Sequence, residues 1–230
     1  MKLLCTICAR SGSKGVKNKN LKKINGIELV VRAIRQAKSI KQIEDIIIST
    51  DSDKIEKLAK KNGAISIGLR MKSLSGDRVP KIKVIRDALL RTEKKLNKKY
   101  DFIIDLDVSS PLRHLSDIKK AIKIFNQNNS DNLLTVCSAR KNPYFNMLEY
   151  SKNGLIRKVK ILKKVISSRQ EAPKVYEMNA SFYIWKRKIL FSNKPFYRKK
   201  TTLFEMPFER SLDIDSNIDF KIVKYLLNDK

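Results

Sequence analysis

The fold is decided near the amino terminus by the apolar run LLCTICA (residues 3–9) and by the loop RSGSKG (residues 10–15) that follows it. A short, unbroken apolar run is typical of a strand that is buried on both faces of a parallel sheet. The loop directly after such a strand lies at the strand's carboxyl end, where open α/β sheets bind their ligands. The two segments together predict a ligand-binding α/β fold.

Short apolar runs and helix-like patterns alternate along the rest of the chain, as in a βα-repeating fold. We expect an α/β protein with a doubly wound, mostly parallel sheet. The expected strands are residues 46–49, 64–67, 102–106, 132–137 and 180–185. The expected helices are residues 27–38, 53–61, 79–97, 116–126 and 218–227, and Asp77 is the expected amino-terminal cap of the helix over 79–97.

Residues 142–173 interrupt this alternation. They contain the turn Asn153-Gly154 between two segments of alternating apolar residues, which favours a β-hairpin. We therefore expect one α/β domain formed by residues 1–141 and 174–230, with residues 142–173 inserted into it as a small arm.

Length and composition fit one cytoplasmic domain. The chain has 230 residues, of which 42% are hydrophobic, enough for a core. No apolar run is long enough to span a membrane, and Arg10 and Lys14 come too early for a signal peptide. Three cysteines form no even disulfide framework. Cys5 and Cys8 are three apart on a strand and so point to opposite faces, which favours buried thiols over a redox or metal-binding pair.

The net charge of +28, from 51 Lys and Arg against 23 Asp and Glu, has three interpretations. A basic surface can bind nucleic acid through phosphates. The lysines are evenly scattered, however, which favours an ordinary solvated surface. A third interpretation is that the positive field attracts anionic substrates. The charge by itself does not decide the function.

The loop after the first strand has the composition of a phosphate-binding loop. Gly12 and Gly15 allow backbone N–H groups to approach phosphate oxygens, and Arg10, Lys14 and Lys19 can neutralise their charge. The spacing matches neither G-x-x-x-x-G-K-[ST] nor G-x-G-x-x-G. An ordinary solvated turn is therefore the alternative interpretation.

Asp213-Ile214-Asp215 is a second candidate site. Residues two apart in an extended segment project on the same side, so both carboxylates can reach one cation. Hard oxygen ligands close to phosphates favour Mg²⁺. The alternative is a pair of carboxylates in a charged surface strand.

The loop, from Ala9 to Lys19-Asn20-Leu21, resembles the signature of the acylneuraminate cytidylyltransferases, the CMP-sialic acid synthetases. Residues 5–8 running into the loop, Leu106-Asp107 and residues 140–146 most resemble the CMP-N,N'-diacetyllegionaminic acid synthases of that family. Further family motifs follow in the same order over nearly the whole chain: Ser49-Thr50-Asp51, Leu69-Arg70, Ser109-Ser110-Pro111-Leu112-Arg113, Arg169-Gln170, Asn179 and Ser211-Leu212-Asp213-Ile214-Asp215.

The resemblance implies a Rossmann-like, GT-A-like nucleotidyltransferase that transfers CMP from CTP to the anomeric hydroxyl of an acidic nine-carbon sugar and releases pyrophosphate. Arg10 and Lys14 would hold the triphosphate, and Lys19 would stabilise charge at the α-phosphate. Asp213 and Asp215 would hold Mg²⁺ or Mn²⁺. The nucleotide pocket would consist of Ala9, Arg10, Ser11, Gly12, Asn20, Arg70 and Asp77.

The resemblance also implies where the sugar and a second subunit bind. Asp107, Arg169, Gln170 and Asn179 would contact the sugar, with Arg169 facing its carboxylate. Residues 142–173 would form a dimerisation arm that completes the sugar site of the neighbouring subunit in a homodimer. No nucleic acid or membrane partner is implied.

Asp107 departs from many sialic acid-specific relatives, which have Gln at this position. An ionised carboxylate only accepts hydrogen bonds, whereas an amide also donates them. We hypothesise that Asp107 accepts a hydrogen bond from an amide N–H of a diacetamido sugar such as N,N'-diacetyllegionaminic acid. The alternative is that Asp107 lies behind the sugar site or touches the metal.

Several other functions are also compatible with the sequence. The sugar could be N-acetylneuraminic or pseudaminic acid, or the eight-carbon acid Kdo, although the Kdo enzymes have a different loop pattern. A sugar-1-phosphate nucleotidyltransferase and a non-enzymatic basic nucleic-acid-binding protein are the more remote alternatives.

Overall fold

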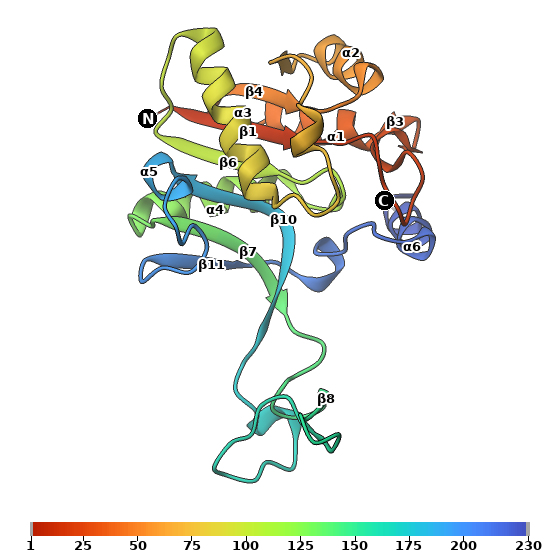
Figure 1. Cartoon of the computed structure of the whole chain (residues 1–230), viewed down its shortest axis with the longest axis vertical. Helices are drawn as coiled ribbons and strands as arrows, with labels where there is room; N and C mark the ends of the chain where they lie inside the picture. The colour runs from red at the N-terminus through yellow and green to blue at the C-terminus, as the bar shows by residue number, and fades with distance from the viewer. Residues whose placement is uncertain (1, 229–230) are drawn as a thin grey trace.

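The computed structural model describes residues 2–228, whose central feature is a seven-stranded sheet in the order β11-β7-β10-β6-β1-β4-β5 (Figure 1). Strand β10 runs antiparallel to both of its neighbours, and the other strand pairs are parallel. The prediction of a mostly parallel sheet is therefore confirmed. The strands are β1 (Leu3–Cys8), β4 (Ile43–Ser49), β5 (Ile65–Ser66), β6 (Phe102–Leu106), β7 (Asn132–Ser138), β10 (Tyr176–Lys186) and β11 (Thr201–Glu205).

Helices cover both faces of the sheet. Cys5 belongs to the larger buried cluster and Cys8 packs against the smaller one on the other face, so the two thiols point apart as expected. Helices α3 (Lys81–Leu96) and α5 (Arg187–Leu190) pack on the smaller cluster. The larger cluster lies under α1 (Leu29–Lys38), α2 (Asp53–Lys61), α4 (Leu115–Gln127) and α6 (Asn217–Asn228).

Strand β1 marks the point where the strand order reverses, because β6 pairs on one side of it and β4 on the other. All three strands are parallel, so the loops that follow them meet at one edge of the sheet. In a doubly wound sheet this edge is where ligands bind. It brings the loop after β1 next to residues 50–52 and 107–113.

Several predicted boundaries are wrong in instructive ways. The helix predicted from residue 27 begins at Leu29, because Asn25 (φ 53°) and Gly26 (φ 73°) form the turn of a hairpin between β2 (Lys23–Ile24) and β3 (Ile27–Glu28). The helix predicted from residue 79 begins at Lys81. Asp77 does not cap it, because its carboxylate pairs with two cations of the loop after β1. Neither β11 nor α5 was predicted.

The arm predicted at residues 142–173 contains the expected hairpin, formed by β8 (Leu148–Tyr150) and β9 (Ile156–Lys158). Gly154 (φ 76°) lies in its turn. The hairpin forms a sheet of its own and projects well away from the main sheet (Figure 1). The ends of the two predicted domain segments at residues 1 and 229–230 lie outside the described residues. Within residues 2–228, no helix combines the length and apolar character needed to cross a membrane.

Candidate active site

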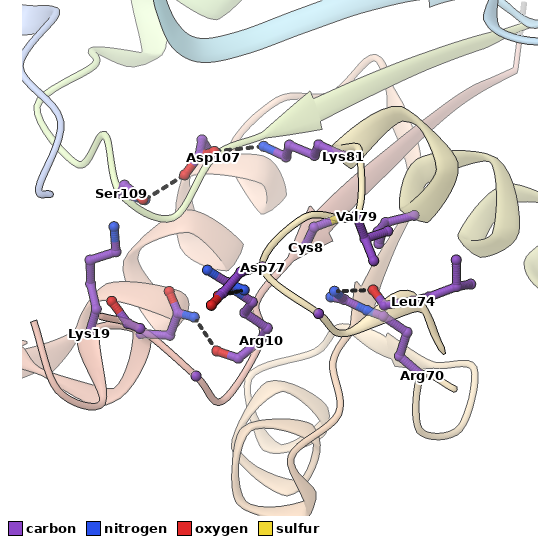
Figure 2. A pocket seen from close by; sticks show the side chains of 15 residues that line it. Cys8, Arg10, Lys19, Arg70, Leu74, Asp77, Val79, Lys81, Asp107 and Ser109 are labelled. Carbon is purple, nitrogen blue, oxygen red and sulfur yellow. Dashed lines mark hydrogen bonds and ion pairs between the residues drawn. The ribbon is translucent and has the colours of Figure 1, made fainter. Parts of the chain in front are cut away.

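A pocket lies at the carboxyl ends of β1 and β6, where the loop after β1, the segment before α3 and the loop after β6 converge (Figure 2). It brings together seven of the residues predicted for the site, from four separate parts of the chain. The lining residues are Cys8, Arg10, Gly12, Ser13, Lys19, Asn20, Arg70, Leu74, Gly76, Asp77, Val79, Lys81, Val84, Asp107 and Ser109.

Asp77 joins the two cations that were predicted to hold a triphosphate. Its Oδ1 pairs with the Arg10 guanidinium, and its Oδ2 lies 2.7 Å from Lys14 Nζ. Hydrogen bonds from Lys14 and Arg10 lower the pKa of Asp77. An anionic ligand that binds to Arg10 and Lys14 therefore has to compete with a carboxylate already paired with them.

The loop after β1 is held in place by its own neighbours. The Ser11 N–H donates to Asp51 Oδ1 at 2.6 Å, and the Ser11 hydroxyl donates to Asp51 Oδ2 at 3.0 Å. Asn20 donates from Nδ2 to the main-chain oxygen of Arg10 at 2.8 Å, and buried Ala9 continues the pairing with β4 through Ser49. Ala9, Ser11 and Asn20 thus shape the loop, and Asp51 anchors it.

Two contacts join this loop to the carboxylate pair near the other end of the chain. Lys19 donates from Nζ to the main-chain oxygen of Ile214 and lies 3.2 Å from Asp215 Oδ1. Gly15 lies so close to Asp215 that a Cβ at residue 15 would be only 1.7 Å from its main-chain oxygen. The loop and the residues predicted to hold the metal therefore form one continuous surface.

Asp213 and Asp215 are exposed on either side of buried Ile214, so they share the solvent-facing side of their segment. Desolvation raises the pKa of Asp213, and repulsion from Asp215 and Asp107 raises it further. Such mutual repulsion is what a bound cation would relieve. Within residues 2–228, no cluster of three or more His, Cys, Asp or Glu is placed to hold a metal. Two carboxylates alone could supply only part of the ligands of a divalent cation, with water and phosphate oxygens as the rest.

Arg70 is buried at the floor of the pocket. Its Nε donates to Ser49 Oγ at 3.1 Å, and its Nη2 donates to the main-chain oxygen of the same residue. The backbone N–H of Arg70 also donates to Thr50 at 2.7 Å. The guanidinium therefore fixes the end of β4 while it lines the pocket.

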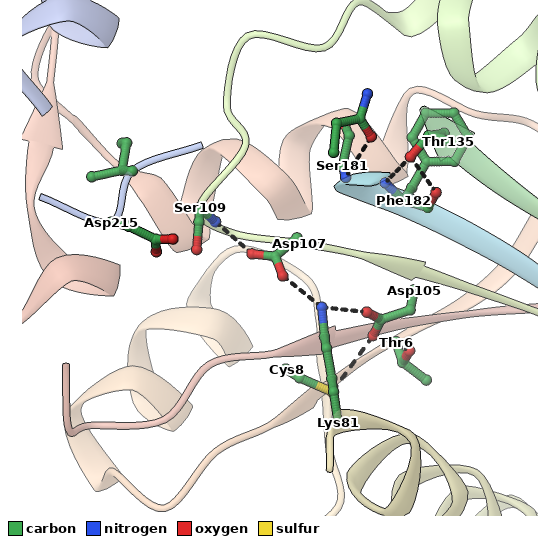
Figure 3. A network of polar contacts seen from close by, with 12 residues as sticks. Thr6, Cys8, Lys81, Asp105, Asp107, Ser109, Thr135, Ser181, Phe182 and Asp215 are labelled. Atoms are coloured by element: carbon green, nitrogen blue, oxygen red, sulfur yellow. Dashed lines mark hydrogen bonds and ion pairs between the residues drawn. The ribbon is translucent and has the colours of Figure 1, made fainter. Parts of the chain in front are cut away.

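Asp107 is held by a lysine that was not among the predicted site residues. Lys81 Nζ lies 2.6 Å from Asp107 Oδ2 and 2.7 Å from Asp105 Oδ2, and the backbone N–H of Ser109 donates to Asp107 Oδ1 at 2.8 Å (Figure 3). Desolvation acts to raise the pKa of Asp107, but Lys81 and Ser109 outweigh it and lower this pKa to about 2. Asp107 is therefore ionised and only accepts hydrogen bonds.

A weak signal for Lys81 exists in the sequence. Lys81 is four residues before Ile85 and seven before Ala88, so a cation lies on the buried stripe of α3. A charged residue on such a stripe needs a partner in the interior. The sequence alone does not show that the partners are Asp105 and Asp107.

Arg113 supports the loop after β6 from behind. It is 2% exposed, and its guanidinium donates to the main-chain oxygens of Asp107 and Ser181 and to Gln36. Burial lowers the pKa of Arg113 to about 10. His114, the single histidine, precedes α4, and its backbone N–H donates to Asp117 Oδ2 at 2.9 Å, so it occupies the capping position that begins the helix.

Three of the predicted sugar-binding residues do not line the pocket. Arg169 and Gln170 lie at the base of the arm in the 3₁₀ turn Arg169–Glu171, where Arg169 donates to the main-chain oxygen of Ala139. Asn179 is 6% exposed and donates to Ser211 Oγ at 2.9 Å. Asn179 therefore supports the segment that leads to Asp213.

Comparison with known proteins gives one consistent result. A family model described as cytidylyltransferase matches residues 4–228. The chain is 48% identical over 226 residues to the CMP-N,N'-diacetyllegionaminic acid synthase of Campylobacter jejuni, covering 98% of this chain and 95% of that protein. It is also 48% identical over 228 residues to the post-translational flagellin modification protein B of Campylobacter coli, covering 99% of this chain and 96% of that protein.

Among solved structures, CMP:2-keto-3-deoxy-manno-octonic acid synthetase complexed with CTP matches with a TM-score of 0.71 and 13% identity. The match covers 100% of this chain and 99% of the other. At this identity the likeness supports the fold alone.

Proposed function

The chain belongs to the cytidylyltransferase family, and from that premise we propose that it transfers CMP from CTP to the anomeric hydroxyl of N,N'-diacetyllegionaminic acid. Several of its relatives are named for CMP transfer to a nonulosonic acid, among them a CMP-N,N'-diacetyllegionaminic acid synthase and a pseudaminic acid cytidylyltransferase. The observation that carries the proposal is the pocket lined by the cations Arg10 and Lys19 and by ionised Asp107, with Asp215 paired to Lys19 beside it.

The reaction forms a bond from the sugar's anomeric oxygen to the α-phosphorus and breaks the bond from that phosphorus to the pyrophosphate. Catalysis of such a transfer consists mainly of positioning and charge neutralisation. We assign the triphosphate and the departing pyrophosphate to Arg10 and Lys14, which exchange Asp77 for phosphate oxygens. Lys19, which is 13% exposed and already adjoins Asp215, would stabilise charge at the α-phosphate.

The nucleoside end of CTP is assigned to the side of the pocket formed by Asn20, Arg70 and Asp77, with the backbone of Ser11 and Gly12 close to the phosphates. Gly12 has no atom within 4 Å of the position where a Cβ would be, so this stretch of backbone is open to a ligand. Ala9 is assigned an indirect role in CTP binding: it follows β1 directly, and its backbone N–H donates to Ser49 and so positions the loop.

Asp213 and Asp215 would hold the divalent cation, Mg²⁺ or Mn²⁺. When bound, the cation supplies charge neutralisation at the phosphates and orients both substrates. Both aspartates must be ionised for this role, and the mutual repulsion between them favours cation binding.

The choice of sugar is assigned to Asp107. Because its carboxylate is ionised, it can receive a hydrogen bond from an acetamido N–H but cannot donate one. The close relationship to a protein named for N,N'-diacetyllegionaminic acid supports the same assignment. Arg169 and Gln170 lie in the arm outside the pocket, so their contact with a sugar would have to occur in the site of a neighbouring subunit.

A homodimer is proposed because the arm cannot cover its own apolar surface. Tyr150 of β8 and Ile156 of β9 pair across the hairpin, and they are 77% and 64% exposed. Leu148, two residues before Tyr150 and thus on the same face, is 66% exposed. An isolated two-stranded hairpin is at best marginally stable in water. A second copy of the chain would cover this face. The reaction is assigned to the cytoplasm, where CTP is available.

The test measures pyrophosphate release from CTP, in the presence of Mg²⁺, with each of a panel of acidic sugars. The highest kcat/KM is expected with N,N'-diacetyllegionaminic acid, and lower values with pseudaminic and N-acetylneuraminic acids. An equal or higher kcat/KM with N-acetylneuraminic acid would refute the legionaminic assignment. Reaction with Kdo, or with a sugar-1-phosphate and UTP or GTP, would support those other enzyme classes. If no sugar leads to pyrophosphate release and the protein binds oligonucleotides tightly at physiological salt, the assignment as an enzyme is refuted.

A further inference from the structure

Lys81 connects the pocket to a side chain in the protein interior. Its ammonium bridges Asp107, which is 21% exposed in the pocket, and Asp105, which is 3% exposed (Figure 3). Asp105 is held in turn by β1, because Thr6 donates from its hydroxyl to Asp105 Oδ1 at 2.6 Å. The Cys8 thiol also donates to Asp105 Oδ1 at 3.5 Å. The buried carboxylate cannot turn away without losing these partners, so it serves as a fixed anchor for the lysine.

The other groups that face Asp107 do not provide this anchor. Arg113 donates to the main-chain oxygen of Asp107 and so fixes its backbone. Tyr183 of β10 and Asp213 interact with the Asp107 carboxylate at longer range. Asp105 and Asp213 are both acidic and repel Asp107. Without the Lys81 ammonium, only the Ser109 backbone N–H would hold the carboxylate against two neighbours of like charge.

Each oxygen of Asp107 already accepts one hydrogen bond, from Lys81 at Oδ2 and from the backbone of Ser109 at Oδ1. These two bonds fix the plane of the carboxylate. The remaining lone pairs of both oxygens then have defined directions in the pocket. A ligand that is recognised there has to bring an N–H or O–H donor to a fixed point.

We propose that Lys81 is a positioning residue for sugar recognition: it ties Asp107 to the buried anchor Asp105 and so sets where the acidic sugar must present its hydrogen-bond donor. This inference rests on the proposed function. It assigns to Lys81 an effect on sugar binding that is separate from CTP binding, since Lys81 has no place among the phosphate-binding cations Arg10, Lys14 and Lys19.

The test measures KM for CTP and for N,N'-diacetyllegionaminic acid separately in Lys81→Met and Lys81→Arg. In Lys81→Met the sugar KM is expected to rise about ten- to hundredfold, the range for losing a positioned hydrogen bond to a charged group. The CTP KM is expected to change less than about twofold, because the ion pairs of Lys81 are to Asp105 and Asp107 and not to a residue assigned to CTP. Lys81→Arg keeps the cation and is expected to recover most of the sugar affinity.

Two further variants separate positioning from mere packing. Lys83→Met makes the same substitution at an exposed site two residues along α3 and is expected to leave both KM values unchanged. In an Asp107→Asn background, Lys81→Met is expected to change the sugar KM less than about twofold, because the two residues act as one unit. If Lys81→Met does not fold, Lys81→Met with Asp105→Asn removes the cation and its buried anion together and is measured instead.

The outcomes distinguish this inference from the proposed function. The role of Lys81 is overturned if Lys81→Met has a wild-type KM for the sugar, or if its KM values for CTP and for the sugar rise equally. Neither result affects the proposed cytidylyltransferase function. An independent effect of Lys81→Met in the Asp107→Asn background also overturns it. A wild-type protein that activates no nonulosonic acid overturns the proposed function and this role with it.

Discussion

At the scale of single residues, Gly15 shows how the absence of a side chain lets two distant segments of the candidate site come into contact. Its backbone packs on the main-chain oxygen of Asp215, with no space for a Cβ. Lys19 reinforces the same contact through its bond to Ile214. The loop that was predicted to bind phosphate and the segment that was predicted to bind metal therefore hold each other in position.

Gly15→Ala is expected to separate these two segments, because the new methyl group would collide with backbone, which cannot move as a side chain can. We expect a lower Tm and a fall in kcat/KM on the order of 100-fold, as for a lost positioning contact. Gly12→Ala is the matched control, because nothing lies within 4 Å of its Cβ position. Equal Tm values for the two variants would contradict the packing role of Gly15.

Asp213 is expected to reduce the stability of the protein in the absence of metal. Its pKa is raised above the ordinary value of 3.8, chiefly by desolvation and then by Asp215, so folding favours its protonated form. The cost of ionising it is therefore present at neutral pH and disappears as the pH falls below about 3.8. Such costs are typical of groups kept for binding rather than for stability.

Asp213→Asn should accordingly raise the metal-free Tm at pH 7, and the gain should vanish in acid. The same variant should lose the Tm increase that Mg²⁺ gives the wild type, and its kcat should fall on the order of 100-fold. Differential scanning calorimetry at several pH values, with and without Mg²⁺, measures both effects. A lower metal-free Tm at pH 7 would contradict the assignment.

At the scale of elements, the arm hairpin has one apolar and one polar face. Tyr150 and Ile156 share the apolar face, whereas Glu149 and Arg157 form an ion pair on the other. The pattern is that of a half-buried antiparallel pair, although this chain alone buries neither face. In the proposed homodimer, the second copy of the chain would bury the apolar face of the hairpin.

Ile156→Asp is expected to convert a dimer into a 26.6 kDa monomer, because it places a charge in the proposed interface. Light scattering measures the mass. Activity should fall with the dimer, since Arg169 and Gln170 would no longer reach a neighbouring site. Arg157→Gln on the polar face should keep the wild-type mass. A wild-type chain that is monomeric at micromolar concentration would contradict the dimer.

At the scale of the whole molecule, the net charge of +28 should act on the rate at which substrates arrive. Both CTP and the acidic sugar are anions, and a positive field raises the association rate of anions. Salt screens this field over about 8 Å at physiological ionic strength. We expect kcat/KM for CTP to fall several-fold between about 50 and 300 mM KCl. The kcat at saturating substrate should change little. A salt-independent kcat/KM would leave the charge without a role in steering.

The sequence alone was enough to predict the mostly parallel sheet, the basic glycine-containing loop after β1, the shared orientation of Asp213 and Asp215, and the hairpin in the arm. Each of these is written in neighbouring residues: the apolar run of residues 3–9, the glycines and cations of residues 10–15, the spacing of Asp213 and Asp215, and Asn153-Gly154. Short-range patterns of this kind follow from the periods of strands and from turn geometry.

Which side chains meet became evident only in the folded chain. Asp77 pairs with Arg10 and Lys14 rather than capping α3, and Lys81 pairs with Asp105 and Asp107. These partners are separated by more than twenty residues, and they meet because parallel strands bring the ends of distant segments to one edge of the sheet. Hydrophobic periodicity predicts individual strands and helices but not which distant side chains come into contact. The position of a strand within the sheet decides it.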